Sequence, residues 1–210
     1  MNKSRLEALS DGVFSIVMTL LIIDIKVPKL NGDAVTNQEL WQRLAEEWPL
    51  FRSYFISFIV IAMYWIAHHA FFHFYVRQIN RTVTNINILF LMLLTFIPFS
   101  AHLLGQYSRN EVAIFLYAMN IIGIGLALFA MMQIVIRDKE LAHEQISRRL
   151  IIQGTIRVLL PPAFAFLAIF VAYLSIPASL FLFAFPVIFN VIPGSLDFFE
   201  RLVLKRKPSS

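Results

Sequence analysis

Six apolar stretches, each close to the length of a helix that crosses a bilayer, run through this chain. We place them at about residues 5–27, 54–76, 86–104, 112–136, 156–174 and 176–196. A spanning helix needs about 20 mainly apolar residues, because its backbone polar groups must be satisfied within the segment. The stretches lack the alternation that is typical of β-barrel strands. The sequence therefore predicts an all-α membrane protein with six transmembrane helices.

The composition agrees with a chain that lies mostly in lipid, since 59% of its residues are hydrophobic and 15% are charged. The chain has no cysteine, which excludes disulfides and metal sites built on thiolates. In a membrane protein the net charge of +5 indicates topology rather than binding to nucleic acid. We therefore expect the lipid bilayer as a partner, with no nucleic acid, cofactor or metal.

Lysine and arginine residues gather in alternate loops. Twelve lie near the two ends of the chain and in the second and fourth loops, whereas the first, third and fifth loops hold Lys29, Arg43 and Arg109. The positive-inside rule then places both termini in the cytoplasm, in a multi-pass protein of the plasma membrane. We expect a membrane domain over residues 1–204 and a basic cytoplasmic tail over residues 205–210.

The longest loop on the opposite side, residues 29–49, is acidic and contains two tryptophans. We interpret it as a short interfacial helix anchored by Trp41 and Trp48. The alternative is an acidic vestibule that concentrates cations through Asp33, Glu39, Glu46 and Glu47.

Few ionisable residues lie inside the expected spans, and each one needs a partner or water. The first helix leaves the cytoplasm and the second returns to it, so Asp11 reaches the same membrane level as His68. We therefore expect a cluster of Arg5, Asp11 and a histidine near the cytoplasmic side. The alternative is that His68, His69 and His73 all face the headgroups. His69 and His73 share a helical face, but no carboxylate at a matching spacing completes a metal site.

The chain lacks the motifs of an enzyme or an ATP-driven pump: it has no P-loop, nucleophile elbow or glycine-rich dinucleotide turn. The Thr-Val-Gly-Tyr-Gly filter of the usual potassium channels is also missing. On a helical wheel the first span gathers Ile16, Thr19 and Ile23 on one face, with Leu20 beside them. This aliphatic stripe with one hydroxyl fits either a packing face or a pore, and periodicity does not decide between them.

Three segments resemble the transmembrane protein 175 family of potassium channels. Arg5 to Asp11 is similar to the family's Arg-x-x-x-Phe-Ser-Asp signature, with Leu9 in place of Phe. Residues 65–68, Trp-Ile-Ala-His, resemble its Trp-x-x-His motif, and Asn87, Leu89 and the Phe-Ile-Pro-Phe turn at 96–99 look like its third helix.

The resemblance implies a homotetrameric, potassium-selective passive channel that is built from one repeat per subunit. It implies that the first helix lines the pore, with a constriction formed by Ile16, Thr19, Leu20 and Ile23. It also implies a structural polar network of Arg5, Ser10, Asp11 and His68, with His69 and His73 as further candidates.

Three other functions remain open from the sequence. A proton channel of the same fold is the nearest, because proton passage needs only a transient wire of water. A secondary transporter should have discontinuous helices, and prolines could break the fifth and sixth spans at Pro161, Pro162, Pro186 and Pro193. A scaffold without transport activity is the third.

Overall fold

A computed structural model describes residues 2–23, 25–28, 36–144 and 146–191, with side chains described as far as Pro186. The described chain forms eight helices: α1 (Lys3–Ile23), α2 (Asn37–Glu46), α3 (Trp48–Phe74), α4 (Arg81–Thr95), α5 (Ile97–Gln106), α6 (Glu111–Arg137), α7 (Arg148–Ala172) and α8 (Ile176–Val191). Five apolar segments are long enough to cross a membrane, with α4 and α5 together forming one of them. The predicted all-α membrane fold is confirmed, and the count of six spans holds approximately because α8 is shorter over its described residues.

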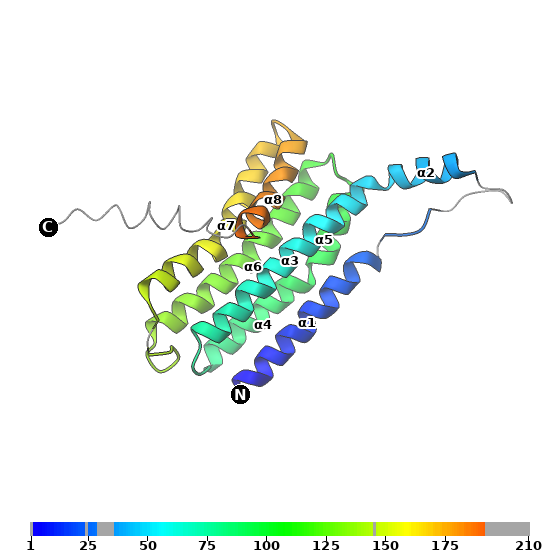
Figure 1. Ribbon diagram of the computed structural model, residues 1–210. Coiled ribbons are helices and arrows are strands. Elements are labelled where there is room, and N and C mark those ends of the chain that lie inside the picture. Colours follow the sequence, from blue (N-terminus) through cyan, green and yellow to red (C-terminus); the bar gives the residue numbers. More distant parts are fainter. Residues whose placement is uncertain (1, 24, 29–35, 145, 192–210) are drawn as a thin grey trace.

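The long helices pack side by side in one bundle, with α1 on one flank and α7 and α8 on the other (Figure 1). Helix α6 is the most buried of the five long apolar segments: 56% of the residues in its apolar window are buried. Its side chains anchor α3 through polar contacts inside the bundle. Tyr64 donates a hydrogen bond to the Ile121 carbonyl (2.9 Å), and the hydroxyls of Ser57 and Tyr117 lie 2.9 Å apart.

The third expected span, residues 86–104, is not one straight helix. Helix α4 ends at Thr95, Phe96 is the residue between the two helices, and α5 begins at Ile97 with Pro98 in its first turn. Proline has no N–H to donate, and its ring crowds the backbone of the preceding turn. The turn that we recognised at residues 96–99 is therefore present, and it divides the single span predicted over residues 86–104 into two helices.

Prolines do not interrupt the next helices. Helix α7 continues from Arg148 to Ala172 through Pro161 and Pro162, and α8 continues through Pro186. The ring of Pro162 packs directly against Gly125 of α6, where a Cβ would overlap the ring. The expectation that prolines break the fifth and sixth spans is therefore wrong at these positions, and Pro193 lies outside the described residues.

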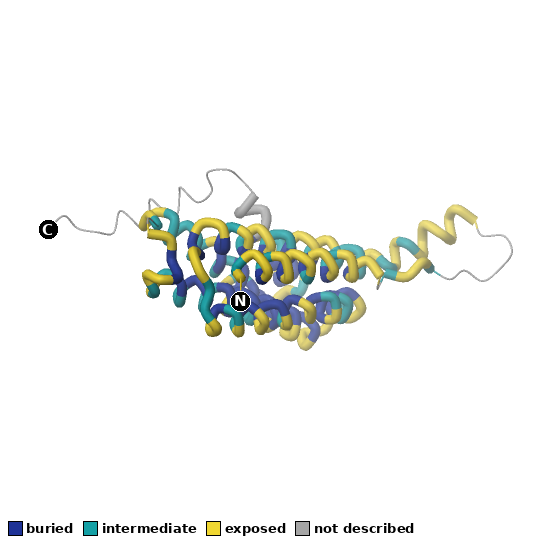
Figure 2. Tube along the Cα trace, turned by 90° about the horizontal axis from the view of Figure 1, so that it is seen from below, coloured by how far each residue is buried: buried dark blue, intermediate teal, exposed yellow. Residues whose placement is uncertain are grey.

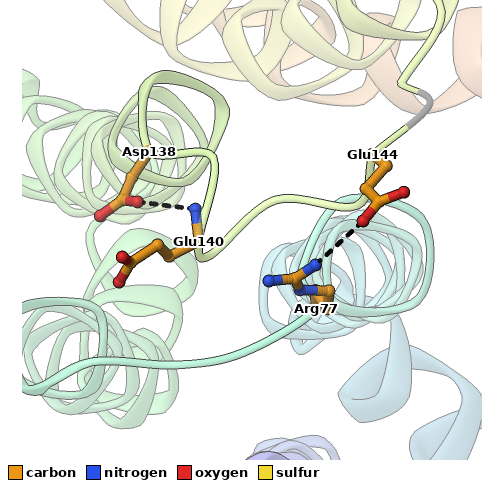
Figure 3. A network of polar contacts seen from close by, with 4 residues as sticks. All are labelled: Arg77, Asp138, Glu140 and Glu144. Atoms are coloured by element: carbon orange, nitrogen blue, oxygen red, sulfur yellow. Dashed lines mark hydrogen bonds and ion pairs between the residues drawn. The ribbon is translucent and has the colours of Figure 1, made fainter.

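The ends of α3 and α6 are joined at one end of the bundle. A short antiparallel bridge pairs Val76 with Ala142, and the Arg77 guanidinium lies 3.4 Å from the Glu144 carboxylate (Figure 3). The loop is tightened by Asp138, which accepts a hydrogen bond from the Glu140 backbone N–H (2.9 Å; Figure 3). Helix α1 begins at this same end of the bundle, because Lys3 Nζ donates to the Val76 carbonyl (2.7 Å).

Helix α2 extends away from the bundle (Figure 1). Thr36 and Glu39 form a reciprocal capping box at its start, and none of its residues is buried. The predicted short helix in this loop is present, with the Trp41 side chain 73% exposed. Asp33, which we assigned to a possible acidic vestibule, lies outside the described residues.

Candidate functional site

Helix α1 buries only one of its faces. Five residues at helical spacing face the bundle: Leu6, Ser10, Phe14, Val17 and Leu21. Only 28% of the residues in its apolar window are buried, the smallest share among the five long apolar segments. The other side of α1 is therefore exposed in the described subunit (Figure 2), and its second half, which carries Ile16, Leu20, Ile22 and Ile23, is mainly apolar.

The four expected constriction residues lie on this uncovered surface. Ile23 is 67% exposed, Ile16 59% and Leu20 42%, and Thr19 is exposed beside them. Gly12 lies on the same side, and a Cβ built there would meet nothing within 4 Å. We call Ile16, Thr19, Leu20 and Ile23 the α1 stripe. Its role in a pore stays a prediction.

The Thr19 hydroxyl is oriented by its own helix. Its Oγ1 donates to the Ile16 carbonyl (2.8 Å) and lies 3.1 Å from the Ser15 carbonyl. Because the hydrogen is used within the helix, the oxygen lone pairs remain available to accept from water or to coordinate a cation. Thr19 is therefore the member of the α1 stripe that can offer a side-chain oxygen.

Behind this surface, a buried chain of hydrogen bonds connects α1, α4 and α3. His68 Nε2 lies 2.8 Å from Asn87 Oδ1, and the ring nitrogen donates because an amide oxygen only accepts. Asn87 Nδ2 then donates to Ser10 Oγ (3.1 Å), whose hydroxyl donates to the Leu6 carbonyl (2.9 Å). His68, Asn87 and Ser10 are at most 2% exposed, so each polar group depends on this chain for its partner.

Aromatic rings enclose the His68 imidazole. Phe90 stacks on it with ring centroids 5.2 Å apart, Phe72 lies 4.7 Å away and Phe14 meets it edge-on at 5.8 Å. These rings come from three helices, so the imidazole fixes how α1, α3 and α4 fit together. This environment favours a structural role for His68.

Asp11 has a different partner from the one that we expected. Its Oδ1 accepts a hydrogen bond from Trp65 Nε1 (2.9 Å), at an exposed site between α1 and α3. Arg5 is exposed and makes no ion pair with a residue that the structure describes. Arg5 and Asp11 are six residues apart, which places them about 120° apart around the helix axis. The expected pairing of Arg5 with Asp11 is therefore wrong within the described subunit.

His69 and His73 lie outside the buried chain. Both are exposed on α3, with nearly parallel rings whose centroids are 6.2 Å apart. Trp65 stacks on His69 at 5.8 Å, so the three rings form a column along the surface of α3. Across the described residues, no group of three or more histidine, aspartate or glutamate side chains could hold a metal ion.

These hydrogen bonds bring the three segments of the family resemblance together: Ser10 and Asp11 from the first, Trp65 and His68 from the second, and Asn87 from the third. A sequence model of the family described as "Endosomal/lysosomal potassium channel TMEM175" matches residues 5–98, which contain α1 to α4 and the start of α5. The crystal structure of a lysosomal potassium-selective channel TMEM175 homologue from Chamaesiphon minutus superposes with a TM-score of 0.76 and 28% identity, covering 89% of this chain and 95% of that one. The chain is therefore similar to the TMEM175 family in its first 98 residues and in its fold.

Two proteins with similar sequences carry different functional names. A potassium channel of Streptomyces collinus is 40% identical over 136 residues, which cover 62% of this chain and 64% of that protein. The endosomal/lysosomal proton channel TMEM175 of Gallus gallus is 34% identical over 119 residues, which cover 53% of this chain and 24% of the chicken protein. The matched part therefore spans less than two thirds of either relative.

Two residues in the TMEM175 motif region have contacts that our sequence reasoning missed. We assigned Asn87 to the family resemblance but not to the polar network, although an asparagine inside an apolar span signals a need for a partner. Trp65 was likewise a motif residue without a role, and it holds the Asp11 carboxylate. Trp65 and His68 are one helical turn apart on α3: Trp65 contacts Asp11 directly, and His68 is joined to the adjacent residue Ser10 through Asn87.

Proposed function

We propose that this chain forms a homotetrameric, potassium-selective passive channel whose pore is lined by α1. The observation that carries the proposal is the exposure of the α1 stripe on the least buried long helix of the subunit. The names of the bacterial relatives, which are potassium channels, support the choice of ion. Four copies of α1 around one axis would bring four stripes together and cover an apolar surface that one subunit leaves open.

Each ring of the α1 stripe has a distinct physical task in this proposal. Four Ile23 side chains form a hydrophobic constriction that excludes water when it is narrow and passes a partly dehydrated ion when it widens. Four Thr19 hydroxyls supply oxygen ligands one helical turn away, because their hydrogens are held by the helix. Potassium is larger than sodium and holds its water less tightly, so a narrow site with few oxygens favours potassium to a modest degree.

The orientation that we propose has both termini in the cytoplasm of a cell with the protein in its plasma membrane. Basic residues support it, since the end of the bundle where α1 begins also carries Arg77, Arg81, Arg137, Arg148 and Arg149. By the positive-inside rule this end faces the cytoplasm.

Current through purified protein in liposomes tests the proposal. We expect a reversal potential that follows the potassium gradient when potassium and sodium are mixed. Thr19→Val should shift the reversal potential toward equal permeability while current persists. Thr95→Val is the matched control, because Thr95 is exposed on α4 and donates to its own helix at Met92 (2.8 Å). Equal shifts for both variants would contradict the role of Thr19, and an absence of cation current would contradict the channel.

Proton conduction is the second candidate, because the vertebrate relatives are named proton channels. A pH gradient in liposomes without permeant metal cations separates the two functions. A current that follows only the proton gradient would contradict the proposed potassium channel and support a proton channel. The secondary-transporter hypothesis has less support, because α7 is continuous through both of the prolines that were expected to break it.

A further inference from the structure

A lateral groove with a cavity volume of about 210 Å³ lies between α3, α6 and α7, away from α1. Its floor is apolar and includes the buried residues Phe71, Met132 and Val158. Its rim includes Ile66, 56% exposed, and Phe74, 51% exposed. Neither the α1 stripe nor the buried polar chain takes part in it, so the proposed pore leaves this feature unexplained.

Small residues create the groove. Ala62, Ala67 and Ala70 line it from α3, and Gly154 lines it from α7. At Gly154 a Cβ would overlap the Tyr75 hydroxyl, so a larger residue there would displace the Tyr75 side chain. That hydroxyl donates to the Leu150 carbonyl (2.6 Å) and so connects the end of α3 to α7 across the groove floor. The groove is therefore bounded by a defined contact between helices.

Besides the Tyr75 hydroxyl, the polar side chains of the groove are a cation and an amide. Arg157 and Gln153 line it, and no acidic residue does. Arg157 is exposed and forms no hydrogen bond or ion pair with another residue that the structure describes. It lies in α7, where the expected fifth span begins at about residue 156. A guanidinium at this depth, beside an apolar wall and without a carboxylate, is suited to a phosphate.

The length of the groove suits a hydrocarbon chain. Its α3 wall extends from Ile59 to Phe74, which is about 22 Å along a helix. One leaflet of a bilayer contributes about 15 Å of hydrocarbon. An acyl chain therefore fits along the wall while its headgroup stays at the arginine end.

We propose that this groove binds an anionic phospholipid, with an acyl chain along α3 and the headgroup phosphate on Arg157. The lipid comes from the leaflet at the end where α3 finishes and α7 begins, because Arg157 and Tyr75 lie toward that end. Charge complementarity selects an anionic lipid over a zwitterionic one, since the groove offers a positive side chain and no negative one.

Native mass spectrometry of protein extracted from membranes with equal phosphatidylglycerol and phosphatidylcholine tests this proposal. We expect the wild type to retain phosphatidylglycerol preferentially. Arg157→Gln should reduce that preference about fivefold, which corresponds to about 1 kcal/mol for one basic residue at an anionic surface. Arg148→Gln is the matched control: Arg148 is exposed on the same helix, does not line the groove and lies about half a turn around from Arg157. It should keep the preference.

A second measurement tests the acyl-chain position. The chain has no cysteine, so Ala70→Cys gives a single labelling site inside the groove. A fluorophore at this position should be quenched more by brominated phosphatidylglycerol than by brominated phosphatidylcholine, and Arg157→Gln should remove the difference. Equal loss of lipid in the Arg157 and Arg148 variants, or no preference in the wild type, would overturn the proposal. Disulfide-linked dimers through Ile66→Cys would assign the groove to a second copy of the chain and would also overturn it.

Discussion

Helices α1 and α6 have similar hydropathy but different roles in the subunit. The mean hydropathy of their apolar windows is 1.9 and 2.3, yet 28% of the residues are buried in α1 and 56% in α6. Helix α6 is already surrounded by α4, α5, α7 and α8. Helix α1 packs through one face and leaves the α1 stripe uncovered. Hydropathy therefore indicates which helices enter the membrane, whereas burial indicates which surface is left for another subunit.

A pair of glycine substitutions gives the largest expected difference between these helices. Gly125→Leu on α6 should lower the free energy of unfolding by about 3 kcal/mol, because its Cβ would overlap the Pro162 ring and that ring has little freedom to move. Gly12→Leu on α1 should leave the subunit folded, because its Cβ has open space. Thermal unfolding in detergent measures both. Equal destabilisation would show that α1 is as closely packed within the subunit as α6.

The buried contact between α1 and α4 should be more sensitive to substitution than the exposed side of α4. Asn87→Leu keeps the branched shape of the side chain but leaves Ser10 and His68 without their shared partner, which should cost about 2 kcal/mol. The control is Thr95→Val on the exposed side of the same helix, which should change the free energy of unfolding very little. If both variants unfold at the same temperature, the buried chain does not hold α1 on the bundle.

A smaller effect distinguishes the two candidate partners of Asp11. Asp11→Ala and Trp65→Phe should show a coupling energy of about 0.5–1 kcal/mol in a double-mutant cycle, because the two side chains share one exposed hydrogen bond that either change removes. Arg5→Gln and Asp11→Asn should be additive, because the structure does not bring these residues together. Thermal stability in detergent is the measurement. Coupling between Arg5 and Asp11 with none to Trp65 would restore the pairing that the sequence suggested.

The structure explains which sequence predictions were successful. Hydropathy located the membrane segments because a bilayer imposes a length on any helix that crosses it. It could not find the break at Phe96, since Pro98 changes the backbone without changing the hydropathy. The wheel grouped Ile16, Thr19 and Ile23, but a stripe of this kind has the same period whether it faces a core or a pore. Exposure within a folded subunit supplied that information.

The polar contacts were harder to predict. Membrane depth brought Asp11 and His68 to the same level, but depth does not define the angle around the helix axis. The adjacent residues Ser10 and Asp11 point to different partners: Ser10 reaches Asn87 inside the bundle, and Asp11 reaches Trp65 at its surface. Such a division depends on how three helices are rotated against one another, which the sequence of one chain does not specify.

The smallest expected effect is at α2, which lies outside the bundle. The Thr36 backbone N–H and hydroxyl donate to the Glu39 carboxylate and hold its pKa below the ordinary value of 4.5. A lowered pKa in the folded state means that ionised Glu39 stabilises the cap above pH 4.5 and that this stability is lost as the pH falls through the folded pKa. Hydrogen exchange in residues 37–46 should therefore quicken on acidification beyond its intrinsic dependence on pH. Glu39→Gln should remove this extra dependence.

Modification of a cysteine at Ile23 by a charged, water-soluble thiol reagent tests the proposed role of the α1 stripe most directly. The chain has no cysteine, so the background is free of other thiols. The matched control is Leu126→Cys, because Leu126 is 51% exposed on α6 and does not belong to the α1 stripe. If α1 lines the pore, the reagent should block potassium current through Ile23→Cys liposomes and leave Leu126→Cys unchanged. A current that persists unchanged in Ile23→Cys, with the thiol unreacted in the conducting protein, would contradict the account.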